Sequence, residues 1–214
     1  MINSALPINY ILQNRYKITK IIGQGGFGIT YEASDAMLNQ KVCIKELFIS
    51  GNSTRNQNNS VLTRDTETLN VEDFTNKFIE EARQLARFRH PNIVRVLDIF
   101  RFNNTAYMVM EFVAGENLKN YVNKKGFLSS ENAYKVMFQL LDAVETVHKM
   151  GMLHRDIKPD NIIIGDKLDV VLIDFGSARD FRDGKTSTQT AILTPGYAPP
   201  EQYSEKAKRG PYTD

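Results

Sequence analysis

The chain has little that would tie it to a membrane, an oxidising compartment or a polyanion. Its one cysteine, Cys43, excludes an intramolecular disulfide and suits a reducing cytosol. No run of 18 or more apolar residues is present, and residues 1–14 lack the basic and apolar parts of a secretory signal. Lys and Arg number 27 against 25 Asp and Glu, so the net charge is only +2. We therefore expect a cytoplasmic protein, or the cytoplasmic part of a longer one, with no membrane segment and no nucleic-acid partner.

The first half of the chain is predicted to form a β-sheet. Apolar, β-branched runs alternate with turns rich in glycine and asparagine, which is typical of antiparallel strands. The predicted strands are residues 16–22, 29–33, 42–48, 94–100 and 106–112. Residues 1–15 would be an N-terminal extension. Residues 49–70 are polar and without periodicity, so we expect a surface insertion there that can hold a short ordered piece.

One helix is predicted inside this half, at about residues 71–87. Asn70 is the expected N-cap, and acidic residues follow in the first turn. Apolar residues recur at helical spacing and form one stripe. Glu81 lies within that stripe, three positions after Phe78 and four before Leu85. A carboxylate on the buried side of a helix needs a partner.

The second half is predicted to be mainly helical. A short helix at 118–125 ends before a glycine, and a long helix follows, capped by Ser129 or Ser130 and reaching Met150. The change from strands to helices implies two lobes, one at 16–112 and one at 113–214.

Two strings in the second half carry the strongest chemical signal. Residues 154–161 read His-Arg-Asp-Ile-Lys-Pro-Asp-Asn, and thirteen positions after Asn161 comes Asp174-Phe175-Gly176. The spacing brings together a candidate base (Asp156), a cation for phosphate (Lys158) and two oxygen ligands for a metal (Asn161 and Asp174). Such a set suits transfer of the γ-phosphoryl group of ATP.

Two further strings in the first half fit a nucleotide. Gly23-x-Gly25-x-x-Gly28 is followed by a β-type run, whereas the glycines of a dinucleotide-binding turn open a helix. This favours a glycine hairpin whose backbone lies close to phosphates. Lys45 ends the string Val42-Cys43-Ile44-Lys45 inside an apolar strand. Its ammonium needs compensation, which phosphates and Glu81 would supply.

Taken together, these strings resemble the eukaryotic-like serine/threonine protein kinase family, over residues 16–214. The wording Pro-Gly-Tyr-Ala-Pro-Pro-Glu-Gln-Tyr from Pro195 is similar to bacterial members. The resemblance implies a bilobal α+β fold: a five-stranded antiparallel sheet with one helix, then a mainly helical C-terminal lobe. That lobe would be incomplete, because the chain ends at Asp214, where the central helix of the family's larger lobe begins.

The resemblance also assigns roles to single residues. The catalytic residues would be Asp156, Lys158, Lys45 and Glu81. Asn161 and Asp174 would hold Mg²⁺ or Mn²⁺. The ATP-binding residues would be Ile22, Gly23, Gln24, Gly25, Gly26, Phe27, Gly28, Thr30, Cys43, Lys45, Met110, Glu111, Val113 and Ile163. The regulatory residues would be Arg155, receiving a phosphate, and the phosphate-bearing candidates Thr186, Ser187, Thr188 and Thr190.

Within the same resemblance, Thr194 belongs to the substrate-facing loop and contacts Asp156 and Lys158. The leading hypothesis is an ATP-dependent kinase that phosphorylates Ser or Thr of protein substrates, including itself. The alternative is a catalytically weak truncated kinase or a pseudokinase-like nucleotide-binding scaffold. A small-molecule phosphotransferase is disfavoured by Lys158 and by residues 194–201, which serve peptide substrates. Apolar side chains left without their usual cover predict self-association.

Overall fold

The chain is organised as two compact units. The computed structural model describes residues 4–65, 70–175, 179–180, 194–204 and 207–214. Unit 1 comprises residues 1–87 and 95–112, and unit 2 comprises residues 88–94 and 113–214.

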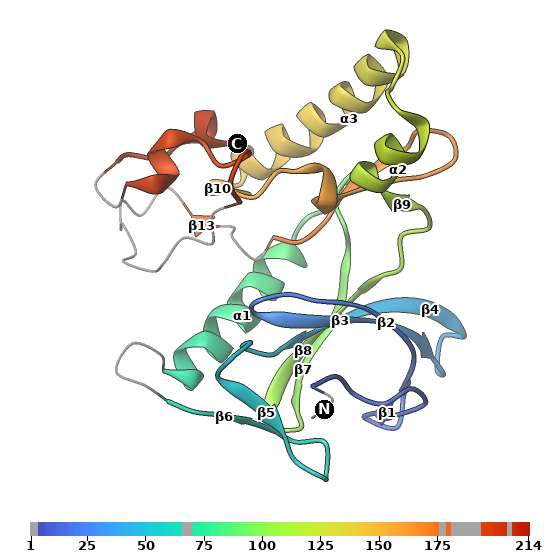
Figure 1. Ribbon diagram of the computed structural model, residues 1–214, viewed down its shortest axis with the longest axis vertical. Helices are drawn as coiled ribbons and strands as arrows, with labels where there is room; N and C mark the ends of the chain where they lie inside the picture. The colour runs from blue at the N-terminus through green and yellow to red at the C-terminus, as the bar shows by residue number, and fades with distance from the viewer. Residues whose placement is uncertain (1–3, 66–69, 176–178, 181–193, 205–206) are drawn as a thin grey trace. The chain divides into compact units, whose positions relative to one another are not determined.

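Unit 1 is built on a six-stranded antiparallel sheet with the strand order β1-β2-β3-β4-β8-β7 (Figure 1). Its strands are β1 (Ile11–Leu12), β2 (Tyr16–Gln24), β3 (Gly28–Asp35), β4 (Gln40–Leu47), β7 (Val96–Phe102) and β8 (Thr105–Glu111). The five predicted strands are present. The sixth, β1, comes from the expected N-terminal extension and pairs with the start of β2. Leu6 and Leu12 are fully buried, so burial of apolar side chains holds this segment against the sheet.

The polar insertion contains a β-hairpin, formed by β5 (Ser53–Arg55) and β6 (Val61–Thr63). Two asparagines stabilise the turn of this hairpin. The side-chain oxygen of Asn56 accepts hydrogen bonds from the N–H groups of Asn58 (3.0 Å) and Ser60 (2.9 Å). Asn59 adopts a left-handed conformation with φ 63°, which asparagine tolerates better than most residues. The short ordered piece expected in this insertion is therefore a hairpin whose turn is held by hydrogen bonds.

Helix α1 (Val71–Leu85) is the one helix of the first 112 residues among those the structure describes. Its predicted N-cap is confirmed, because the side chain of Asn70 accepts a hydrogen bond from Asp73 N at 3.1 Å. Phe78, Ala82 and Leu85 are buried, as the stripe indicates. The helix ends two residues earlier than predicted, at Leu85, with Ala86 as its C-cap. Figure 1 shows α1 beside the strands of unit 1.

The core of unit 1 lies on one face of its sheet. The buried cluster consists of Ala5, Leu6, Leu12, Tyr16, Ile18, Ile29, Tyr31, Ala33, Val42, Ile44, Phe48, Val61, Tyr107 and Val109. Side chains alternate along a strand, so Val42, Ile44 and Glu46 of β4 face this core. The side chains between them, including Lys45, point to the opposite face. The N-terminal segment and the β5–β6 hairpin thus supply the cover of the core face, through Leu6, Leu12 and Val61.

Unit 2 is mainly helical, with small sheets that shape its loops. Its elements are β9 (Glu116–Asn117), α2 (Leu118–Lys125), α3 (Ser130–Lys149), β10 (Met152–Leu153), η1 (Pro159–Asn161), β11 (Ile162–Ile164), β12 (Val170–Leu172), β13 (Arg179–Asp180), η2 (Pro200–Tyr203) and η3 (Pro211–Thr213). Strands pair in the orders β12-β11-β9 and β10-β13. The long helix is capped by Ser129, whose hydroxyl accepts from Asn132 N at 3.3 Å. In the part of the chain that the structure describes, no helix has the length and hydropathy to cross a membrane.

The segment between α1 and β7 belongs to unit 2, although its flanking elements belong to unit 1. Backbone hydrogen bonds explain this. Val94 N donates to Leu172 O at 3.0 Å, and Leu172 N donates to Asn92 O at 2.8 Å. The side chain of Asn92 also donates to Val170 O at 2.6 Å and to Gln139 Oε1 at 3.0 Å. Residues 88–94 are thereby tied to β12 and α3.

One face of α3 is apolar and exposed. Four large apolar side chains on it are at least half exposed: Tyr134 (67%), Met137 (50%), Phe138 (69%) and Leu141 (56%). Their spacing places them on a single side of the helix. An apolar patch of this kind is a typical association surface.

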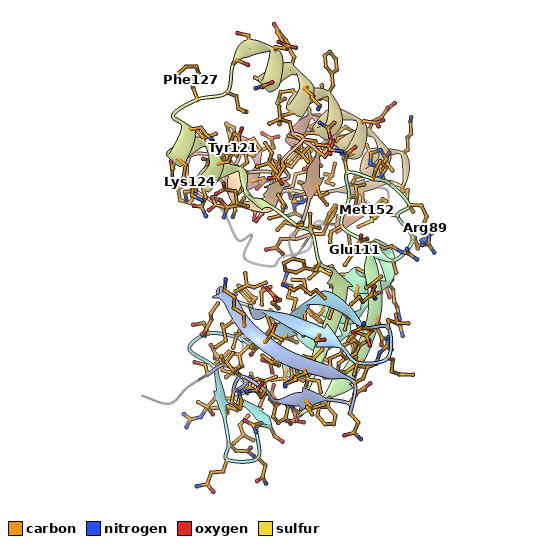
Figure 2. The ribbon with its side chains drawn as sticks, turned by 90° about the vertical axis from the view of Figure 1, so that its right-hand side faces the viewer. Arg89, Glu111, Tyr121, Lys124, Phe127 and Met152 are labelled. Atoms are coloured by element: carbon orange, nitrogen blue, oxygen red, sulfur yellow. The ribbon has the colours of Figure 1, made fainter. Side chains whose placement is uncertain are left out.

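We expect the 214-residue chain to self-associate through this face. Phe138→Lys combined with Leu141→Lys should shift sedimentation-velocity profiles towards the monomer, since burying each large apolar side chain contributes about 1.5–3 kcal/mol. Phe127→Lys is the control, because Phe127, labelled in Figure 2 and 78% exposed, lies outside α3. Equal association of both variants and the wild type would contradict the prediction.

Candidate functional site

In unit 2, the loop after β10 is held by the carboxylate of Asp214. This carboxylate is fully buried and accepts hydrogen bonds from His154 N at 2.7 Å and Arg155 N at 2.6 Å. His148 Nε2 lies 2.9 Å from Asp214 Oδ2 and acts as a third donor. Arg155 adopts a left-handed conformation, φ 66°, and its carbonyl accepts from the buried side chain of Gln202 at 3.2 Å. Both backbone groups of Arg155 are thus fixed, immediately before Asp156.

Asp156 is the centre of a hydrogen-bonded cluster. Lys158 Nζ lies 2.8 Å from Asp156 Oδ2 and donates to Thr194 Oγ1 at 2.8 Å. Thr194 Oγ1 donates in turn to Asp156 Oδ1 at 2.7 Å. Asn161 Nδ2 donates to Asp156 Oδ2 at 2.8 Å and to Asp156 O at 2.9 Å. The structure therefore brings four predicted site residues together, and an ionised carboxylate matches all of these donors.

Asn161 and Asp174 lie at the same end of the β11–β12 hairpin. Ile162 pairs with Leu172, and Ile173 N donates to Asn161 O at 2.9 Å. Because the Asn161 amide nitrogen points to Asp156, its oxygen points elsewhere and is suited to a cation. Asp174 is exposed and left-handed, with φ 59°. The described residues contain no group of three His, Cys, Asp or Glu side chains that could hold a metal. One carboxylate and one amide oxygen instead fit Mg²⁺, which takes further ligands from phosphates.

His154 is a structural residue of the same loop. It is fully buried, and its ring lies 4.4 Å from that of Phe175. Nδ1 accepts from Asp156 N at 3.3 Å, and Nε2 lies 3.2 Å from Ile173 O. These contacts define a neutral ring that donates through Nε2. Burial lowers the pKa of His154 below its ordinary value of 6.5, so the ring stays neutral and links the loop to the segment of Asp174.

In unit 1, the glycine string forms the hairpin that joins β2 to β3. Gly25 N donates to Gly28 O at 2.9 Å. A Cβ on Gly28 would lie 2.8 Å from Glu46 O, so the packing of β3 on β4 requires glycine there. A Cβ on Gly23 or Gly26 would meet no protein atom within 4 Å. The protein's own packing does not require glycine at these two positions, which fits a loop that leaves room for a phosphate chain.

Lys45 lies beside this hairpin on β4, opposite Thr30 and Met108. Its stem passes Gly28, since a Cβ there would lie 3.7 Å from Lys45 Cγ and Cε. Lys45 is half-buried. Glu81 on α1 is also half-buried, and its Oε1 is enclosed by protein. Both charged side chains belong to unit 1.

The remaining nucleotide candidates lie partly in unit 1 and partly in unit 2. Cys43 is half-buried on β4 and pairs with the buried Met110 of β8. Ile22, Gln24 and Phe27 are exposed near the glycine hairpin, where Phe27 stacks on Phe74 with centroids 6.0 Å apart. Glu111 N donates to Arg95 O at 2.9 Å, so an adenine contact at Glu111 falls to its carbonyl. Val113 and Ile163 are half-buried in unit 2.

Four candidate phosphorylation sites lie outside the described residues: Thr186, Ser187, Thr188 and Thr190. Arg155, the expected receiver of a phosphate, is half-buried. The contacts of His148 with Asp214 and of Gln202 with Arg155 had no local signal, because each joins residues far apart in sequence.

Comparisons with known proteins show the family of the chain. The protein kinase domain family matches residues 16–214, and the chain belongs to that family. A probable serine/threonine-protein kinase of Clostridium perfringens is 32% identical over 97% of this chain and 27% of its own length. The chain spans about a quarter of the length of the curated relatives it matches.

Two solved structures extend the comparison. The apo form of PpkA-294 superimposes with a TM-score of 0.83 and 38% identity, over 99% of this chain and 75% of that one. Rad53 in complex with AMP-PNP gives a TM-score of 0.61 and 27% identity, over 76% of this chain and 38% of that one.

The buried His154 should make stability depend on pH. Its folded-state pKa lies below the unfolded value, so its contribution to stability is present above pH 6.5 and is lost as the pH falls below 6.5. We expect the free energy of unfolding to fall by up to about 1.4 kcal/mol per pH unit for this proton. Urea unfolding at pH 7.5, 6.5 and 5.5 measures it. His154→Phe should show a shallower slope, and equal slopes in the two proteins would contradict the prediction.

Proposed function

We propose that this chain is the catalytic domain of an ATP-dependent protein serine/threonine kinase. The observation that carries the proposal is the cluster of Asp156, Lys158, Asn161 and Thr194, joined by hydrogen bonds of 2.7–2.9 Å. Phosphoryl transfer needs a base, a cation and metal ligands held in position, and this cluster supplies a carboxylate, a lysine and an amide that fits a metal. The names of the curated relatives support the serine/threonine class.

In the proposed reaction, the acceptor hydroxyl attacks the γ-phosphorus of ATP, and the bond to the β–γ bridging oxygen breaks to release ADP. Asp156 orients the hydroxyl and accepts its proton. Lys158, 2.8 Å from Asp156, neutralises charge on the transferred group. Thr194 holds these two side chains at a fixed separation. Positioning and charge neutralisation account for most of the catalysis of such transfers.

ATP is proposed as the nucleotide because the glycine hairpin and Lys45 suit a triphosphate, and because Rad53, a structural relative, is known with the ATP analogue AMP-PNP. Asn161 and Asp174 would hold Mg²⁺, with Mn²⁺ as a substitute. When bound, this ion neutralises phosphate charge. Lys45 would bind the α- and β-phosphates, with Glu81 as its partner. The backbone of the glycine hairpin would approach the phosphates.

The proposed acceptors are Ser and Thr of proteins, including this chain, and the proposed compartment is the cytoplasm. Autophosphorylation among Thr186, Ser187, Thr188 and Thr190 remains part of the proposal, with Arg155 as the receiver. The nucleotide-binding scaffold is the less favoured reading, because a scaffold has no use for a base and a lysine held together by Thr194.

Lys45→Met should abolish phosphoryl transfer and leave the fold largely intact, because it removes the phosphate-binding charge but keeps the apolar stem. The measurement is transfer of labelled phosphate from Mg²⁺-ATP to a generic protein acceptor, beside a thermal melt. Lys41→Met is the matched control: Lys41 lies on the same strand, is exposed, and pairs with Glu32 at 3.1 Å. A Lys45→Met protein with a tenth or more of wild-type turnover would overturn the role of Lys45.

Asp156→Asn and Asp174→Asn should separate the base from the metal ligand. The first should lower turnover by several orders of magnitude with little change in ATP affinity, because Asp156 acts on the acceptor. The second should weaken Mg²⁺-ATP binding as well as turnover. Titration calorimetry with Mg²⁺-AMP-PNP and steady-state kinetics measure both. Equal losses of nucleotide affinity would refute the assigned roles.

A further inference from the structure

The β5–β6 insertion brings a charge into the core face of unit 1. Glu46 on β4 is fully buried. Its carboxylate accepts hydrogen bonds from Tyr31 on β3, Tyr107 on β8 and Arg55 on β5, each 2.6 Å long. Burial and then the Glu46 charge raise the pKa of both phenols, so both stay protonated and donate. The carboxylate is thus saturated by donors from three separate strands.

Arg55 is the member of this network that comes from the insertion. Its side chain is 3% exposed, and it donates to Glu46 Oε2, to Ser4 O at 2.9 Å and to Asn59 O at 2.7 Å. Burial opposes its charge, but Glu46 holds the pKa of Arg55 above its ordinary value. One guanidinium therefore joins the N-terminal segment, the hairpin loop and β4. Removing one partner of such a buried pair is strongly destabilising.

The same stretch of chain touches the glycine hairpin. Ser50 N donates to Gly26 O at 2.8 Å, and Phe48 N donates to Phe27 O at 3.2 Å. The Arg55 guanidinium lies 5.6 Å from the centre of the Phe48 ring. Arg55 thus contacts both Glu46, which follows Lys45 in the chain, and the residue that holds the loop at Phe27.

We propose that Arg55 and Glu46 are positioning residues that set Lys45 and the glycine hairpin for the nucleotide. This inference rests on the proposed function, since it needs ATP to bind these groups. Lys45 and Glu46 project from opposite faces of β4. Fixing the carboxylate on the core face therefore fixes the origin of the lysine on the other. Without the guanidinium, the buried carboxylate must move towards water or draw water in, and either change displaces β4 and residues 48–50. A displacement of about 1 Å is enough to impair transfer.

The test is Arg55→Met, with Arg15→Met as the matched control. Arg15 also pairs with a buried carboxylate in unit 1, donating to Asp35 at 2.9 and 2.7 Å, with Asp35 1% exposed. Asp35, however, ends β3 and pairs with Gln40, at the far end of β4 from Lys45. Both variants should melt at lower temperature. At a temperature well below both melting points, KM for ATP should rise at least fivefold in Arg55→Met and less than twofold in Arg15→Met. KM for the protein acceptor should stay unchanged in both.

The assay temperature and the Arg15→Met control distinguish positioning from general destabilisation. A smaller folded fraction raises the apparent KM for ATP by the reciprocal of that fraction, which stays close to one well below the melting point, and a general loss of stability would act in both variants. Arg55→Met with an unchanged KM for ATP would overturn the inference. If Arg55→Met does not fold, Arg55→Lys decides on the same measurement, because it keeps the charge but loses the three-way fork. An inactive wild type that binds no Mg²⁺-AMP-PNP would instead refute the proposed function.

Discussion

The loop after β10 in unit 2 depends on one buried carboxylate, that of Asp214. It accepts two backbone N–H groups, at 2.7 and 2.6 Å, from the two residues that precede Asp156. Hydrogen bonds to an ionised acceptor are roughly twice as strong as neutral ones. These two hydrogen bonds hold Arg155 in its left-handed conformation. Asp156 is the next residue in the chain. Asp156 then contacts Lys158, Asn161 and Thr194. Asp214 touches none of the atoms that would react, and it acts through geometry alone.

Elements governed by local chemistry were predictable. Helix α1 starts where Asn70 can cap it, the long helix starts directly after its cap Ser129, and the five strands fall on apolar, β-branched runs bounded by turns. Elements governed by distant partners were not. Residues 88–94 join unit 2 because of hydrogen bonds to β12, and no local pattern reports partners so far along the chain. Strand β1 was missed although it pairs with the nearby start of β2.

The candidate site divides in the same way. The motif strings name Asp156, Lys158 and Asn161 because their roles require particular residue types at close spacing. Thr194, 38 positions from Asp156, was reached only through the family resemblance. Glu46 and Arg55 went unnoticed, although Glu46 follows Val42 and Ile44 on the apolar face of one strand. A carboxylate at that position signals a buried partner. The partner could not be named, because it lies in a polar insertion with no periodicity.

Each unit has a buried carboxylate close to a candidate site residue. In unit 2, Asp214 binds the two residues before Asp156, and in unit 1, Glu46 follows Lys45 in the chain. The two carboxylates differ in the donors that they bind. Asp214 accepts backbone N–H groups of the loop, so these hydrogen bonds do not depend on which side chains the loop carries. Glu46 binds the side chains of Tyr31, Tyr107 and Arg55, so its burial is tolerable only when these residues are present. Arg55 comes from the β5–β6 insertion and supplies a cationic partner for Glu46. Without it, the carboxylate would keep the hydrogen bonds of Tyr31 and Tyr107 but lose this countercharge, at a cost of several kcal/mol. The buried glutamate therefore depends on the insertion for its charge balance.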